Sequence, residues 1–239
     1  MPRLKSRVRA PFPAPFFMMI KAIIFDLDGT LIDSMGLWRQ VDEEFLSQRG
    51  CEVPPDLFDH LPQGNSFVQT AQYFRERFGL EESVEDIMKI WTEMVHSHYC
   101  NVVALKPGVK ELLKRIKDTG LKIGLATSNS YELAEKSLTF NGVWHYFEAV
   151  VTGDMHLMGK PYPDIFLRCA EVLSVRPKEC IAIEDTLMGV QAAKAAGMQA
   201  LAIYDEDSAD HHPGIKDIAD AFLMNYEELA EELHRRVNI

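Results

Sequence analysis

Carboxylates that follow short apolar runs are the residues of this chain best suited to chemistry. They are Asp26 and Asp28 in DLDGT, Glu184 and Asp185 in IAIED, Asp154 after VVTG, and Asp205 after ALAIY. Carboxylates gathered in one place repel each other, and burying them without compensation is costly. A divalent cation would relieve this repulsion, and an all-oxygen ligand set suits Mg²⁺ better than a transition metal.

Hydroxyl groups and one lysine add a second kind of chemistry. Thr127 and Ser128 follow another apolar run and precede a helical stretch, where hydroxyls and backbone N–H groups can hold a phosphate. Lys160 lies in GKPYP and supplies a positive point charge. Carboxylates, Mg²⁺, a phosphate site and a lysine together predict phosphoryl transfer.

The elements that position these residues alternate along the chain. Six short apolar runs are typical of parallel strands buried on both faces, and they span residues 20–26, 121–127, 147–154, 180–185, 200–205 and 221–225. Amphipathic stretches with helix start and stop signals lie between them. This alternation predicts an α/β, doubly wound, Rossmann-like parallel sheet. Ligands of such sheets bind beyond the carboxyl ends of the strands, where the polar residues lie.

Two segments depart from this alternation. Residues 34–105 have no strand-like run and predict a helical insertion, which leaves 20–33 and 106–239 as the core. Residues 1–17 carry four basic residues, no acidic ones and four prolines. For the predicted extension, 1–19, we expect either a disordered tail or an upstream start codon, with Met18 or Met19 as the native start. An organelle transit peptide is the alternative.

Composition narrows the class of protein. The 239 residues include 25 Lys and Arg against 36 Asp and Glu, a net charge of −11. This acidity argues against nucleic-acid and anionic-membrane partners, and no apolar run of about 18 residues predicts a membrane span. The four cysteines are scattered, which indicates reduced thiols in a cytoplasmic protein. A monomer is the default expectation.

Four motifs together carry a family resemblance. DLDGT (26–30), LATSNS (125–130), GKPYPDIF (159–166) and IAIEDTLMGVQAAKAAG (181–197) resemble, in order and spacing, the motifs of haloacid dehalogenase-like (HAD) hydrolases. The resemblance covers roughly residues 20–225. The position and helical content of the insertion resemble the C1-type cap of subfamily I, in its β-phosphoglucomutase-like branch.

The resemblance implies roles for individual residues. Asp26 would be the nucleophile that forms an aspartyl-phosphate, and Asp28 would be the general acid and base. Thr127, Ser128 and Lys160 would bind the phosphoryl group. The implied Mg²⁺ ligands are Asp26, Asp28 through its backbone carbonyl, Glu184 and Asp185. The expected enzyme is a Mg²⁺-dependent phosphatase acting on a small phosphorylated metabolite, such as a sugar phosphate.

Two positions in the insertion separate hydrolysis from the alternative reaction. Sugar-phosphate mutases of the same branch resemble this chain in the core but carry a histidine and an arginine where an ungapped alignment places Trp38 and Phe67. Both residues are apolar here. We therefore expect hydrolysis, with a β-phosphoglucomutase-like mutase as the alternative, and substrate selection by Trp38 and Phe67.

Other interpretations are less specific. A signalling receiver domain also uses a strand-end aspartate, but it is about half this length and lacks the Asp26–Asp28 pairing. We expect Asp205 and the pair His211-His212 to lie in solvated loops. Asn129 is predicted to begin the helix that follows it as a capping residue.

Overall fold

The computed structural model describes residues 19–54, 56–57, 66–237 and 239. The predicted N-terminal extension, apart from Met19, therefore lies outside the described residues. Among the helices of the described part, none is long and apolar enough to cross a membrane.

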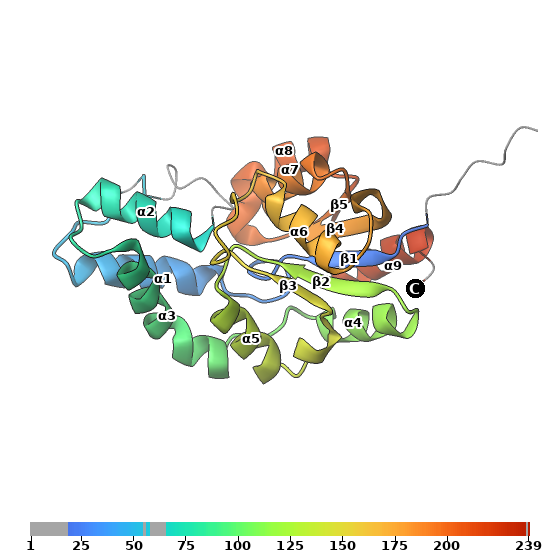
Figure 1. Cartoon of the computed structure of the whole chain (residues 1–239), viewed down its shortest axis with the longest axis horizontal. Helices are drawn as coiled ribbons and strands as arrows, with labels where there is room; N and C mark the ends of the chain where they lie inside the picture. Colours follow the sequence, from blue (N-terminus) through green and yellow to red (C-terminus); the bar gives the residue numbers. More distant parts are fainter. Residues whose placement is uncertain (1–18, 55, 58–65, 238) are drawn as a thin grey trace, which may run out of the picture.

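A six-stranded parallel sheet forms the centre of the molecule (Figure 1). Its strands are β1 (Ala22–Phe25), β2 (Lys122–Ala126), β3 (Ala149–Val151), β4 (Cys180–Glu184), β5 (Gln199–Ile203) and β6 (Ala221–Leu223). In the spatial order β3-β2-β1-β4-β5-β6, the chain adds β2 and β3 on one side of β1 and then β4, β5 and β6 on the other side. The predicted strands and the doubly wound fold are confirmed. The loops after β1, β2 and β4 consequently meet at the switch point, where such sheets bind ligands.

Helices cover both faces of the sheet and create two apolar cores. Ile23 and Phe25 of β1 face a core shared with α4 (Val109–Asp118), α5 (Tyr131–Phe140) and α9 (Tyr226–Val237). Ala22 and Ile24 face the opposite core, built with α6 (Asp164–Val172), α7 (Leu187–Ala195) and α8 (His212–Ile218). Strand side chains alternate between faces, so a strand buried on both sides must be apolar throughout.

The described residues of the insertion between β1 and α4 form three helices: α1 (Met35–Ser47), α2 (Phe67–Phe78) and α3 (Val84–Asn101). Ser66 and Ser83 begin α2 and α3 by accepting hydrogen bonds from backbone N–H groups of the first turn. The helices pack on each other through aromatic rings, principally Phe45, Phe67, Phe74 and Trp91. Helix α3 also packs against α5 of the core, which places the insertion beside the carboxyl ends of the strands (Figure 1).

The chain enters and leaves this insertion at one point. Ile32 and Leu105 form an antiparallel bridge, and the Lys106 N–H donates to the Leu31 carbonyl oxygen at 2.9 Å. The two connections between core and insertion therefore lie side by side.

Three local predictions were wrong, each because tertiary structure decides the position. Asp205 is 6% exposed rather than solvated, because its carboxylate pairs with Lys106 at 2.6 Å and accepts from the Asp207 N–H at the start of the short 3₁₀ helix Glu206–His211. His212 opens α8 and packs 5.0 Å from the ring of Phe222 instead of lying in an exposed loop. Ser130, and not Asn129, caps α5 by accepting from the Leu133 N–H.

Candidate active site

Lys160 joins two carboxylates at the carboxyl ends of β1 and β4. Its Nζ lies 2.5 Å from Oδ1 of Asp26 and 2.5 Å from Oε1 of Glu184, and all three side chains are buried. Burial by itself lowers the pKa of Lys160, but the two carboxylates outweigh this effect and raise that pKa. Lys160 is therefore a stable cation at the centre of the site.

Both oxygens of the Glu184 carboxylate are occupied by the protein itself. Oε1 pairs with Lys160, while Oε2 accepts from the backbone N–H groups of Asp185 and Thr186 and from the Thr186 hydroxyl. The close approach of α7 requires a glycine, because a Cβ on Gly189 would lie 1.9 Å from the Glu184 carboxyl carbon. This arrangement suits a residue that orients Lys160 better than a direct metal ligand.

Asp185 presents an oxygen whose hydrogen-bonding capacity is unused. Its Oδ1 accepts from the Thr30 hydroxyl at 2.7 Å, whereas the buried Oδ2 has no hydrogen-bond partner within the described residues. Gly29, at φ +78°, lets the backbone pass this oxygen, since a Cβ there would lie 2.3 Å from Oδ2. Burial, followed by repulsion from Glu184 and Asp26, raises the pKa of Asp185. An unpartnered buried carboxylate oxygen is costly unless a cation meets it.

These residues fit Mg²⁺ as part of a larger ligand shell. Over residues 19–54, 56–57, 66–237 and 239, no three His, Cys, Asp or Glu side chains are grouped so as to hold an ion by themselves. Mg²⁺ usually takes one or two carboxylates and completes its shell with substrate phosphate oxygens and water. Asp26, Asp185 and the Asp28 carbonyl would supply the protein oxygens.

Three donors hold the side chain of Asp28. Ser34, which begins α1, donates from its hydroxyl to Oδ1 at 2.6 Å, and the Tyr99 hydroxyl of α3 donates to the same oxygen. Asn129, in the loop after β2, donates from Nδ2 to Oδ2 at 2.9 Å. The Asp28 carboxylate is thus fixed jointly by the core and the insertion.

The predicted phosphate site lies in the loop between β2 and α5. Thr127 is buried, and its Oγ1 accepts from the Asn129 N–H at 3.0 Å, while within the described part of the chain its own hydroxyl proton has no acceptor. The carbonyl oxygen of Ser128 accepts from the Phe67 N–H at 2.9 Å, so the start of α2 rests on this loop. Gly153 permits the contact, because a Cβ there would lie 1.9 Å from that carbonyl oxygen.

The two proposed specificity residues occupy different environments. Phe67 is 7% exposed and packs 5.8 Å from the rings of both Trp38 and Trp91, so it belongs to the core of the insertion. Trp38 is half-buried, and its Nε1 donates to the Tyr99 hydroxyl at 2.7 Å.

Sequence reasoning missed four residues of this site: Thr30, Ser34, Tyr99 and Asn129. Thr30 and Asn129 lie inside two of the motifs, so their proximity to the strand ends was a usable signal. Ser34 and Tyr99 lie at the start of α1 and near the end of α3. Nothing in their spacing points to Asp28, because their positions depend on how the insertion folds back.

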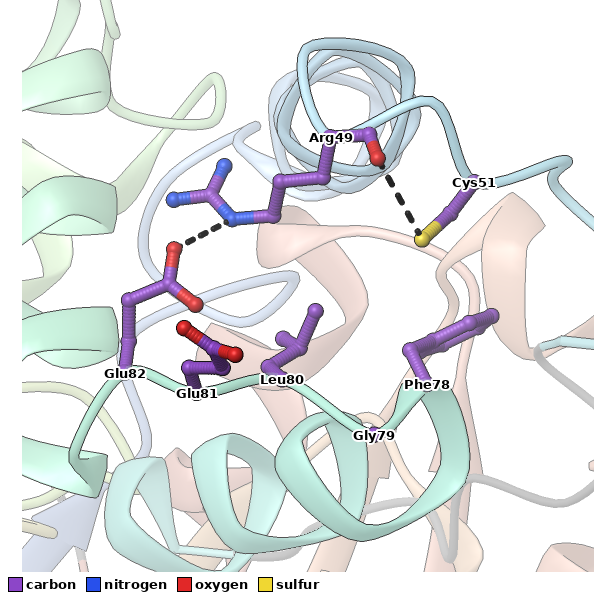
Figure 2. Close-up of a pocket in the computed structure, with 7 residues that line it drawn as sticks. All are labelled: Arg49, Cys51, Phe78, Gly79, Leu80, Glu81 and Glu82. Carbon is purple, nitrogen blue, oxygen red and sulfur yellow. Dashed lines mark hydrogen bonds and ion pairs between the residues drawn. The ribbon is translucent and has the colours of Figure 1, made fainter.

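A separate hollow of about 580 Å³ lies between the end of α1 and the connection from α2 to α3 (Figure 2). Its lining residues are Arg49, Cys51, Phe78, Gly79, Leu80, Glu81 and Glu82. Arg49 donates to Glu82 at 2.8 Å and stacks on the Phe45 ring. The hollow contains none of the residues at the strand ends, so it does not belong to the candidate site.

Comparisons with known proteins bear on this geometry. A family model described as haloacid dehalogenase-like hydrolase matches residues 23–203. A putative phosphatase of Bacillus subtilis, YhcW, is 33% identical over 185 residues, which cover 77% of this chain and 84% of that protein. Hexitol phosphatase B of Escherichia coli K12 is 32% identical over 189 residues, which cover 77% and 83%. A solved structure of a putative β-phosphoglucomutase from Thermotoga maritima aligns with a TM-score of 0.65 and 28% identity, covering 90% of this chain and 99% of that one.

Proposed function

The chain belongs to the haloacid dehalogenase-like hydrolase family, and we propose that it is a Mg²⁺-dependent phosphatase of a small phosphorylated sugar or polyol. It lies in the β-phosphoglucomutase-like branch and is a phosphoric monoester hydrolase, as its motifs predict.

The observation that carries the proposal is the ion pair between Lys160 and Asp26 at the end of β1, with Asp28 held two residues further on. Burial and the nearby Glu184 raise the pKa of Asp26, although Lys160 opposes the rise. Lys160 keeps one oxygen of Asp26 in place, and Oδ2 is the proposed nucleophile. A fixed nucleophile beside a separate acid–base group is the arrangement that covalent phosphoryl transfer needs.

In the first step, Oδ2 of Asp26 attacks the phosphorus atom of the ester. The bond from phosphorus to the leaving oxygen breaks, and its electron pair remains on that oxygen. Asp28 donates a proton to the leaving oxygen, so the products are an alcohol and an aspartyl-phosphate on Asp26. Such a proton transfer contributes about 10²–10⁴-fold to the rate.

In the second step, a water molecule attacks the phosphorus atom of the aspartyl-phosphate. The Asp28 carboxylate takes a proton from this water, the bond between phosphorus and Asp26 breaks, and inorganic phosphate leaves. Lys160 and the Thr127 hydroxyl bind phosphoryl oxygens in both steps. Mg²⁺, held by Asp26, Asp185 and the Asp28 carbonyl, would offset the negative charge of the phosphoryl group.

The helical insertion would act as a cap over this site. The contact between Phe67 and Ser128 lets it exclude water while Asp26 is phosphorylated. Trp38 would face the body of the substrate. Neither Trp38 nor Phe67 carries a charge that could bind a second phosphate, so we favour hydrolysis over a mutase reaction.

The test is phosphate release from a panel of sugar, polyol, nucleotide and carboxylic-acid phosphates, with Mg²⁺ or with EDTA. We expect release that requires Mg²⁺ and is lost in Asp26→Asn, while the matched variant Asp118→Asn, on the exposed surface of α4, keeps full activity. Release that persists in Asp26→Asn or in EDTA would overturn the mechanism. An isomeric sugar phosphate in place of inorganic phosphate would establish the mutase.

A further inference from the structure

The hydroxyl group of Tyr99 is saturated with hydrogen bonds. It accepts from Nε1 of Trp38 at 2.7 Å and from Nδ2 of Asn129 at 3.1 Å. A tyrosine hydroxyl has two acceptor sites and one proton. Since both acceptor sites are used, the proton is directed to Oδ1 of Asp28, which is the third contact.

This arrangement exceeds what packing alone requires of a buried tyrosine. Tyr99 is fully buried, and one partner would satisfy its hydroxyl. Tyr226 is also buried, and its hydroxyl donates a single hydrogen bond, at 2.8 Å, to a backbone acceptor, the Thr30 carbonyl oxygen. The Tyr99 hydroxyl instead joins α1 and α3 of the insertion to the β2–α5 loop and to Asp28.

We propose that Tyr99 is a positioning residue for Asp28. Its hydroxyl, fixed by Trp38 and Asn129, holds the Asp28 carboxyl group where it exchanges a proton with the leaving oxygen. Because Tyr99 belongs to α3, this support exists when the insertion lies against the core, so the acid–base group is in place when the site is covered. The inference rests on the proposed function and deepens it.

The leaving group gives a readout that separates positioning from a general effect on structure. An alkyl alcohol leaves phosphorus poorly without a proton, so its ester depends on Asp28 in the first step. Acetate leaves acetyl phosphate as a stable anion and needs no proton. The ratio kcat/KM reports the first transfer for both substrates.

The experiment compares the unaltered protein with Tyr99→Phe, which removes one oxygen atom and keeps the ring. We expect kcat/KM for the best alkyl phosphate of the panel to fall by about 10- to 100-fold, and kcat/KM for acetyl phosphate to fall by less than about 3-fold. The matched control is Tyr73→Phe on α2, whose hydroxyl contacts Arg77 of the same helix. It should leave both ratios unchanged.

Equal losses for the two substrates, or no loss for either, would overturn the positioning role while leaving the phosphatase standing. Absence of phosphate release by the unaltered protein would remove the proposed function and this inference together. If Tyr99→Phe fails to fold by circular dichroism, Tyr99→Met provides the test. It also removes the hydroxyl and keeps much of the buried apolar volume, and the same leaving-group dependence should appear, with equal losses for the two substrates counting against the inference.

Discussion

Asp42 is a carboxylate buried inside the helical insertion, and we expect it to make the stability of the protein depend on pH. It lies on α1 with 9% of its surface exposed. Burial, with a smaller contribution from Glu43, raises the pKa of Asp42 from 3.8 to about 7. The folded state therefore favours the protonated acid. The contribution of Asp42 to the unfolding free energy is therefore fully present below the unfolded-state pKa of 3.8, and it is lost as the pH rises through the folded-state pKa of about 7.

The size of the effect follows from these two pKa values. They differ by roughly three pH units, and at about 1.4 kcal/mol per unit the full cost of ionising Asp42 in the folded protein approaches about 4 kcal/mol. Between about pH 5.5 and about pH 8.5, the linkage relation predicts that ionisation of Asp42 lowers the unfolding free energy by roughly 2 kcal/mol. Asp42→Asn removes the ionisation and keeps the shape of the side chain. Its stability relative to the unaltered protein should therefore improve by roughly 2 kcal/mol over this pH interval.

Urea unfolding at the two pH values, followed by circular dichroism, measures this difference. The matched control is Glu93→Gln, an exposed position on α3 of the same insertion, which should give the same relative stability at both pH values. A relative stability of Asp42→Asn that does not change with pH, or that falls at the higher pH, would refute the reasoning.

Three further predictions concern the strand ends. Gly189→Ala should abolish phosphate release and lower the unfolding free energy by about 1–3 kcal/mol, because the new Cβ would lie 1.9 Å from the Glu184 carboxyl carbon. An activity assay and urea unfolding measure these effects, and an active variant would contradict the prediction. Asp205→Asn should lower the unfolding free energy measured in urea by about 1–3 kcal/mol, because Lys106 loses the charge of a buried partner 2.6 Å away. An unchanged unfolding free energy would show that this ion pair contributes nothing to stability. Mg²⁺ at about 100 times its Kd should raise the unfolding free energy of the unaltered protein by about 2.7 kcal/mol and should leave that of Asp185→Asn unchanged. Equal stabilisation of both proteins would mean that Asp185 does not bind the ion.

The strand-end chemistry was predictable because a parallel sheet aligns the carboxyl ends of its strands. Apolar runs that end in Asp26, Thr127 and Glu184 have to present those side chains at one edge, whichever strand lies beside which. The proximity of Lys160 to two carboxylates follows from the same argument, together with the need to neutralise buried charge.

The contacts that cross between insertion and core were not predictable in this way. Tyr99 reaches Asp28 only because α3 packs on α5, a contact between segments distant in the chain. Asn129 was expected to begin a helix, but its neighbour Ser130 does so and Asn129 turns towards Asp28 instead. Asp205 lies in an acidic stretch that is typical of a solvated loop, but it is buried and pairs with Lys106, which is distant in the chain. Tertiary packing overrides local composition at all three positions.

The bridge between Ile32 and Leu105 would allow the insertion to be exchanged during evolution without a change in the core. The chain leaves the core and returns to it at paired residues, so the insertion is attached to the core at one place. The register of the sheet therefore does not depend on the length of the insertion. A transplanted insertion of different shape could redirect the enzyme to another phosphate ester without disturbing Asp26 or Lys160. Such an exchange would remove Tyr99, however, so a functional chimera would need its own hydroxyl donor for Asp28.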